Sequence, residues 1–182
     1  MSYCRFAAEL SADTDNPNKH YHDHVYGFPV AGDNELFERL VLEINQAGLS
    51  WTIILKKQAA FQTAFKGFDI ATVAAFDDND RERLLQDAGI VRNRLKINAA
   101  IYNAQQILAI QREYGSFKNW LDSHHLQDKA AWVKLFKRQF KFVGGEIVGE
   151  FLMSTGYLDG AHDEDCPVWA KIQTVLESVR KE

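Results

Sequence analysis

Helix start and stop signals follow one another so closely between residues 33 and 156 that they leave little chain for any other regular element. Apolar residues recur there on a helical period, and Ser or Asp stands before most of the apolar stretches, where helix N-caps are preferred. The strict alternation of apolar and polar residues that marks a half-buried strand is absent. Because several of the expected helices are short, we predict an all-α fold of the irregular multi-helix kind rather than an up-down bundle.

The predicted helices are delimited by a small set of residue types. The expected N-caps are Asp33, Ser50, Asp69, Asp77 or Asp78, and Ser116, and the expected stops are Gly89 and Gly156. Pro167 suits the first turn of a last helix. The expected helices cover about 34–46, 51–64, 70–76, 78–88, 93–113, 116–123, 128–139, 146–155 and 168–181.

Length and composition limit the class of protein. With 182 residues, 46% of them hydrophobic, the chain suits a single domain, which we place at 1–182. The net charge of −4 argues against a general nucleic-acid coat, although not against a local basic surface. No apolar run approaches the length that spans a membrane. The start of the chain, MSYCRFAAEL, lacks the apolar core of a signal peptide, so we expect a cytoplasmic protein in which Cys4 and Cys166 are not joined.

An acidic residue interrupts the apolar face of the helix expected over 34–46. Glu43 shares the helical spacing of Leu36, Leu40 and Ala47, so its carboxylate lies either at the edge of the apolar stripe or buried. If it is buried, it needs a partner or a raised pKa. Trp51 follows at the start of the next helix. An acid on one wall and a ring on another would make a small pocket, although an edge glutamate beside a core tryptophan is the commoner arrangement.

Residues 84–101 predict a helix, a tight glycine turn at Gly89 and a second helix. Amide groups at the turn and at the positive end of the second helix would form a phosphate-binding arrangement. Arg92, Arg94 and Lys96 add positive charge to it. An ordinary helical hairpin with a solvated basic face fits these residues equally well.

A metal site is suggested by residues far apart in the sequence. His162 and Cys166 have the spacing of two ligands on one turn, and Cys4 and the stretch HYHDH supply further candidates. Two cysteines and two histidines satisfy tetrahedral zinc. No CxxC motif is present, and isolated His and Cys residues often have no such role. A zinc ion here would fasten the two ends of the chain together and would not take part in a reaction.

The chain from near residue 4 to about 166 resembles the bacterial 3-methyladenine DNA glycosylase I family. The matching stretches are the N-terminal cysteine, YHDHVYGFP, ELFERLVLEINQAGLSW, ILKKQAAF, LLQDAGIVRNRLKINAAIYNA, FKFVGGEIVGEF and HDEDC. The resemblance implies a DNA glycosylase fold with a helix-hairpin-helix motif at about 78–113, a flipped-base pocket, and a structural zinc joining segments of about 1–26 and 157–170. It also implies a monomer that acts on double-stranded DNA containing alkylated bases, with no membrane partner.

The resemblance assigns roles to particular residues. Glu43 matches the pocket glutamate and is the implied catalytic residue, while Trp51 and Tyr21 match the ring residues that bind the base. The implied zinc ligands are Cys4, His22, His162 and Cys166, which leaves His20 and His24 at the surface. The hairpin residues Gly89, Arg92, Arg94 and Lys96 are the implied DNA contacts.

Four positions depart from the family's usual residues. Phe6 replaces a tryptophan that we still expect to contact the base, Tyr26 replaces another tryptophan, Asn18 replaces a tyrosine, and Leu95 replaces the hairpin glycine. These departures leave the acid, the indole and the zinc ligands in place, but they leave open a shifted substrate preference.

Three hypotheses remain from the sequence. The first is a hydrolase that removes 3-methyladenine from DNA and leaves an abasic site. The second is a damage-binding or DNA-structure-binding protein weakened in catalysis by those departures. The third is a zinc-stapled helical protein with no role on nucleic acid. Many proteins with this kind of DNA-binding hairpin have a catalytic aspartate after a glycine-rich segment. The stretch FVGGEIVGEF offers Glu146 and Glu150 but no aspartate, so we expect Glu43 to be the main polar group and water to be the nucleophile.

Overall fold

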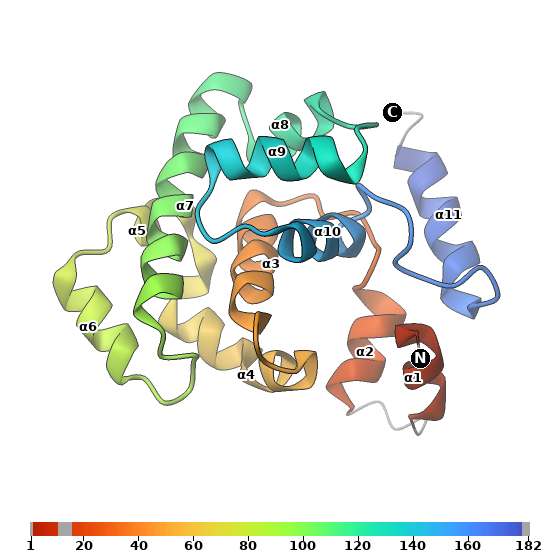
Figure 1. The fold of residues 1–182 in the computed structure, drawn as a ribbon, viewed down its shortest axis with the longest axis horizontal. Helices are drawn as coiled ribbons and strands as arrows, with labels where there is room; N and C mark the ends of the chain where they lie inside the picture. The colour runs from red at the N-terminus through yellow and green to blue at the C-terminus, as the bar shows by residue number, and fades with distance from the viewer. Residues whose placement is uncertain (1, 11–15, 180–182) are drawn as a thin grey trace. The chain divides into compact units, whose positions relative to one another are not determined.

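The computed structural model describes residues 2–10 and 16–179, and every regular element within these ranges is a helix (Figure 1). The all-α prediction is therefore confirmed. The chain forms two compact units. One is Ala31–Val148, and the other combines the chain up to Val30 with the chain from Gly149 onward. None of the described helices is both long enough and apolar enough to cross a membrane.

The Ala31–Val148 unit follows the predicted succession of helices closely. Asp69, Asp77 and Ser116 each cap a helix by accepting a hydrogen bond from a backbone amide of its first turn, as predicted, and Asp128 does the same. Ser50 occupies its predicted cap position, but its side chain makes no such bond. The helices are α3 (Asp33–Gln46), α4 (Trp51–Ala64), the 3₁₀ turn η1 (Lys66–Phe68), α5 (Ile70–Ala74), α6 (Asp78–Gln86), α7 (Arg94–Tyr114), α8 (Phe117–Ser123) and α9 (Lys129–Gln139).

Aromatic rings fill the core of this unit. The rings of Phe65 and Phe68 stack with centroids 5.5 Å apart, and Phe37 meets Phe68 edge-on. A second group joins α8 to α9, where Trp120 lies between Phe117 and Phe136. All of these side chains are buried, so this core fixes α3 and α4 against the helices around them.

Asp33 does not cap the helix that it begins, and that prediction was wrong. Gly32 is the N-cap of α3, and Asp33 is its first residue. The Asp33 carboxylate instead accepts hydrogen bonds from the backbone amides of Phe117 and Lys118 at 2.8 and 3.0 Å, and from Gln111 at 2.7 Å. It therefore supplies acceptors at the start of α8, a helix that begins 84 residues later in the chain.

The other unit contains two helices that the sequence reading missed. They are α1 (Tyr3–Glu9) and α2 (Pro17–His24), followed after residue 148 by most of α10 (Gly145–Ser154) and by α11 (Pro167–Val179). Asn16 caps α2 and Pro17 is its first residue, a start signal that was present in the sequence. Gly156 ends α10 with φ of +83°, and a side chain there would also meet the backbone of Gly27.

Candidate functional site

Four buried side chains from this second unit converge as a metal-ligand cluster. Cys4 lies on α1, His22 on α2, and Cys166 directly before α11, while His162 stands in the loop between α10 and α11. Their ligand atoms all lie within 4.8 Å of one another. His162 Nδ1 is 3.5 Å from Cys4 Sγ and 3.6 Å from Cys166 Sγ, and His22 Nε2 is 3.7 Å from Cys166 Sγ. The predicted cluster is therefore formed, and it could hold a metal ion.

The ring nitrogen of each histidine that faces away from the cysteines is also bonded. His22 Nδ1 lies 2.7 Å from the Asp23 carboxylate, and His162 Nε2 lies 2.8 Å from the backbone oxygen of Tyr26. Partners of this kind fix which nitrogen is free to bind a metal. The backbone amide of Asp163 donates to Cys4 Sγ at 3.3 Å.

Burial shapes the acid–base state of the cluster. It raises the pKa of the Cys4 thiol to about 11; the backbone amide of Asp163 opposes this shift, and Cys166 adds to it. Burial lowers the pKa of His162. Both effects disfavour charge on the ligands, so a bound cation is what would hold the thiols as thiolates. His20 and His24 are exposed, in agreement with the prediction that they lie at the surface.

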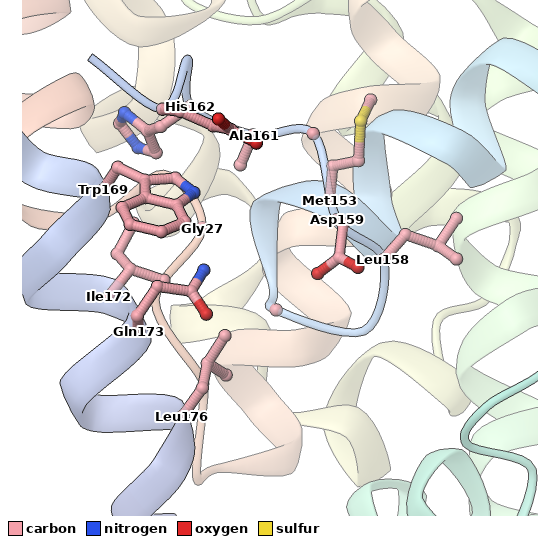
Figure 2. Close-up of a pocket in the computed structure, with 13 residues that line it drawn as sticks. Gly27, Met153, Leu158, Asp159, Ala161, His162, Trp169, Ile172, Gln173 and Leu176 are labelled. Atoms are coloured by element: carbon pink, nitrogen blue, oxygen red, sulfur yellow. The ribbon is translucent and has the colours of Figure 1, made fainter. Parts of the chain in front are cut away.

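A cavity of about 340 Å³ adjoins the cluster on the side of His162. Figure 2 shows Trp169, Ile172, Gln173 and Leu176 of α11 along one wall, with Leu158 and Asp159 of the loop after α10 across from them. The cavity borders the metal-ligand cluster without containing any of its sulfur atoms.

In the Ala31–Val148 unit, Glu43 is buried, which settles the alternative that the sequence left open. Its side chain is 5% exposed, among the buried residues Leu40, Leu42 and Ile44 of α3. The chain then turns at Gly48, whose φ of +84° favours glycine, and α4 begins with the half-buried Trp51. We call residues 43–51 the acid–indole corner.

The packing of α3 on α4 holds this corner. A second buried carboxylate, Glu38, accepts hydrogen bonds from Gln58 at 2.8 Å and from Gln62 at 2.9 Å, both on α4. Two successive turns of α4 are thus tied to one turn of α3, which fixes the direction in which α4 leaves the corner. The other two predicted base-binding residues belong to the second unit, where Tyr21 is buried and Phe6 is 37% exposed.

The predicted hairpin is present as α6, a connection over residues 87–93, and α7 (Figure 1). Position 89 has no room for a side chain, because a Cβ there would lie 2.9 Å from Asp87 Oδ1 and 3.0 Å from Ala60 Cβ. The amide of Gly89 donates to Asp87 Oδ1 at 2.8 Å. Arg92 is exposed, and Arg94 is also exposed while pairing with Glu82 at 2.9 Å.

Lys96 does not lie on the exposed basic face with Arg92 and Arg94. It is 5% exposed, and its Nζ donates to the backbone oxygens of Asn45 at 3.0 Å and Ala47 at 2.8 Å. Burial lowers its pKa. The sequence spacing placed all three basic residues together, but the first turn of α7 directs Lys96 inward to the end of α3, so in this structure its ammonium is not offered to a phosphate.

The departures from the family pattern occupy different surroundings. Tyr26 is buried, donates from its hydroxyl to Glu150 at 3.2 Å, and supplies the backbone oxygen that holds His162. Asn18 is buried, and its backbone oxygen accepts a hydrogen bond from Tyr3. Leu95 is 69% exposed at the start of α7.

The sequence reading missed several residues that hold the sites together. Asp23 was recognisable, because it directly follows a candidate ligand in HYHDH and carboxylates often orient metal-binding histidines. Lys57 was not recognisable: its Nζ donates to the backbone oxygens of Ala88 and Gly89, about 30 residues away in the chain.

Comparisons with known proteins identify the family of this chain. Residues 11–131 match the methyladenine glycosylase family. The chain is 37% identical over 158 residues to DNA-3-methyladenine glycosylase 1 of Escherichia coli K12, covering 76% of this chain and 84% of that one. It is 32% identical over 166 residues to DNA-3-methyladenine glycosylase of Haemophilus influenzae, covering 81% and 89%.

Solved structures of 3-methyladenine DNA glycosylase I also match this chain. The 3-methyladenine DNA glycosylase I of Staphylococcus aureus matches with a TM-score of 0.79 at 36% identity, covering 92% of this chain and 96% of that one. A variant of 3-methyladenine DNA glycosylase I in complex with 3-methyladenine matches with a TM-score of 0.80 at 36% identity, covering 92% and 97%. The all-α fold is therefore that of a class of helical DNA glycosylases. Within this class, the chain belongs to the methyladenine glycosylase family.

Proposed function

We propose that this protein removes 3-methyladenine from alkylated double-stranded DNA by hydrolysing the N-glycosidic bond, leaving an abasic site. The observation that carries the proposal is a buried carboxylate, Glu43, at the end of a helix whose following turn leads directly into Trp51. The relatives of this chain, which are named as 3-methyladenine glycosylases and are matched over most of their length, support the proposal.

The chemistry of the substrate suits such a corner. A methyl group on N3 makes the adenine base a cation, so its bond to the sugar is already weak and selective binding matters more than strong acid catalysis. The indole of Trp51 offers an electron-rich face worth roughly 0.5–2 kcal/mol to a cation, and the carboxylate of Glu43 accepts hydrogen bonds from the base. A normal adenine gains neither interaction fully, and extracting it from a stable pair costs a few kcal/mol. Tyr21 and Phe6 remain predicted base contacts.

Hydrolysis needs no covalent enzyme intermediate. The electron pair of the glycosidic bond leaves with the base and neutralises its positive charge, while water adds to the sugar carbon and loses a proton. We expect no lysine to form a Schiff base. Capture of a protein–DNA adduct by borohydride would contradict this part of the proposal.

The test of the activity is release of methylated bases from alkylated duplex DNA, separated by chromatography. The wild-type protein should release free 3-methyladenine, and Glu43→Gln should bind the DNA but release base at least about 100-fold more slowly. Glu35→Gln is the matched control, because Glu35 lies on the same helix with its side chain 56% exposed. Absence of base release by the wild-type protein would favour a DNA-binding role instead.

For DNA binding, we propose that α6, residues 87–93 and α7 act as a helix-hairpin-helix motif. The exposed Arg92 and Arg94 would neutralise phosphates, and Gly89 would allow the close turn. Lys96 is not included among these phosphate contacts, because its ammonium is bound within the protein.

For the cluster of Cys4, His22, His162 and Cys166, we propose a structural zinc ion. Tetrahedral zinc bonds to sulfur and nitrogen put neighbouring ligand atoms about 3.6 Å apart. The separations of 3.5, 3.6 and 3.7 Å fit this value. Four protein ligands leave no open position for a substrate, so the ion would tie α1 and α2 to the segment before α11. Elemental analysis should find one zinc per chain, and Cys166→Ser should reduce it.

A further inference from the structure

Lys96 and Lys57 join the acid–indole corner to the hairpin from opposite directions. Lys96 lies in the first turn of α7, and its Nζ binds two backbone oxygens at the end of α3, those of Asn45 and Ala47. The last carbonyl groups of a helix have no partner within the helix and carry its negative dipole end. An ammonium group that bonds two such oxygens therefore fixes the point at which α3 stops and the corner turns.

The second contact runs from the helix after the corner to the hairpin. Lys57 lies on α4, six residues after Trp51, and its Nζ is 3.1 Å from the backbone oxygens of both Ala88 and Gly89 in the hairpin connection. Figure 1 shows α3 and α7 side by side, with the α6–α7 connection at the same end of the unit as the start of α4. The corner is thus linked to the hairpin on both sides, through ammonium groups that cross between the two segments.

A third element closes over Lys96. The ring centroid of Phe142 lies 5.8 Å from Lys96 Nζ, within the range of a cation–π contact. The chain next to Phe142 is held by Asn103 of α7, whose side chain bonds both the backbone amide and the backbone oxygen of Lys141, at 2.8 and 3.1 Å. One face of α7 therefore fixes both the end of α3 and the segment around residue 142.

We propose that Lys96 and Lys57 are positioning residues for the reaction, a lysine clamp that holds the acid–indole corner in register with the DNA-binding hairpin. Glu43 and Trp51 can act only if the flipped base arrives in reach, and the DNA is held by the hairpin. Displacements of about 1 Å in such a geometry cost on the order of 100-fold in rate. This inference rests on the proposed function.

The clamp and a direct phosphate contact by Lys96 predict different results. If a lysine neutralises one phosphate, its removal reduces the slope of log K against log salt by about one unit. A lysine that positions the corner leaves affinity and salt dependence nearly unchanged and slows the chemical step. Measuring both quantities on one variant therefore separates the two roles.

The experiment compares Lys96→Met, Lys57→Met and the double variant with the wild-type protein. DNA affinity is measured across a salt series on a duplex containing a stable abasic analogue, and base release is measured in single turnover with protein in excess. Lys96→Met should reduce the single-turnover rate by about 10- to 100-fold, while affinity changes less than about 2-fold and the salt dependence is unchanged. Lys56→Met is the control, because Lys56 is the exposed neighbour of Lys57 on α4.

The double variant tests whether the effects of the two lysines are coupled. Residues that share a network have effects that do not add, so the double variant should be slowed less than the product of the two single effects. Where Lys96→Met fails to fold, Lys57→Met, whose side chain is only partly buried, carries the comparison of single-turnover rates. A single-turnover rate in both single variants equal to that of the wild-type protein would overturn the proposal, as would a salt dependence lowered by one unit in Lys96→Met.

Hydrogen exchange tests the lysine clamp without measuring base release, so its result does not depend on the proposed function. In Lys96→Met, hydrogen exchange should accelerate over residues 45–51 while the aromatic core around Phe65 and Phe68 exchanges as in the wild-type protein. Unchanged exchange over 45–51 would overturn the clamp even if base release is observed. If the wild-type protein releases no base, the proposed function fails, and the exchange result still decides whether the clamp exists.

Discussion

Nδ1 of His22 lies 2.7 Å from Oδ1 of Asp23, so the ring nitrogen that faces away from the cysteines is held by a carboxylate. This bond leaves Nε2 directed at Cys166 and strengthens the ring as a ligand. Asp23 also binds Lys19 at 2.6 Å. Although burial acts to raise the pKa of Asp23, the hydrogen bonds from Lys19 and His22 hold it below its ordinary value, which keeps Asp23 ionised.

The first prediction concerns this carboxylate. Asp23→Ala should weaken the binding of the proposed zinc ion by about 10- to 100-fold, because the imidazole loses both its orientation and its charge partner. Competition titration with a chromophoric chelator measures the change. Asp165→Ala removes an exposed carboxylate next to Cys166 and should leave the affinity unchanged. Equal losses in the two variants would mean that overall charge, and not the bond to His22, is responsible.

The second prediction concerns the bond between Asp33 and the start of α8. Asp33→Ala removes acceptors from two backbone amides and from Gln111, so it should lower the free energy of unfolding by about 2 kcal/mol. Urea denaturation measures the loss. Glu35→Ala, two residues along the same helix and exposed, should change it by less than about 0.5 kcal/mol. A loss of similar size in both variants would show that the first turn of α3 itself is sensitive.

Asp33 also shows where prediction from the sequence ends. Helix starts at residues 70, 78 and 117 could be predicted because each cap bonds an amide within its own first turn, and such local rules can be read directly. The bond from Asp33 to Phe117 spans 84 positions, and no local pattern encodes it. A capping residue type was correctly recognised, but the helix that it serves was not.

The sites divide in the same way. Spacing marked Glu43 and the pair His162 and Cys166 as candidates, and the family resemblance completed the ligand set, but the burial of Glu43 was left open by the sequence and is decided by the structure. The inward direction of Lys96 could not be predicted, because Arg94 and Lys96 share a basic stretch and only the packing of α7 on α3 separates an exposed guanidinium from a buried ammonium. Contacts between helices decide such cases.

The third prediction uses pH. The hydroxyl and amide of Thr72 bond the Asp69 carboxylate and hold its pKa below its ordinary value. The folded protein therefore binds this proton less readily than the unfolded chain, so the ionised cap contributes stability above the unfolded pKa near 3.8 and loses it as pH falls through the folded pKa. Asp69→Asn keeps an acceptor without the charge. The difference in unfolding free energy between the wild-type protein and this variant should be present at pH 7 and vanish near pH 2. A difference that persists near pH 2 would assign it to packing.

The fourth prediction tests the hairpin connection. Gly89→Ala places a methyl group against Asp87 and Ala60 and should force the turn apart, lowering stability by about 1–3 kcal/mol and weakening DNA binding. Thermal unfolding and fluorescence anisotropy on duplex DNA measure the two effects. Gly144→Ala is the matched control, because nothing lies within 4 Å of the added carbon there. Full DNA affinity in Gly89→Ala would remove this turn from the proposed DNA-binding surface.

The last prediction concerns the indole of Trp51. If the pocket selects a cationic base, Trp51→Leu keeps apolar bulk but loses the attraction between the ring face and the positive charge. The 3,9-dimethyladeninium cation, which carries a methyl group in place of the sugar and so keeps the positive charge, should then bind about 2- to 30-fold more weakly, the factor that corresponds to roughly 0.5–2 kcal/mol, while neutral adenine should be little affected. Titration calorimetry with both bases measures this selectivity. Trp169→Leu makes the same change at a partly exposed tryptophan of α11 and should leave it intact. An equal loss of affinity for both bases in Trp51→Leu would assign the indole a role in shape alone, and Glu43 would then have to account for the recognition of charge.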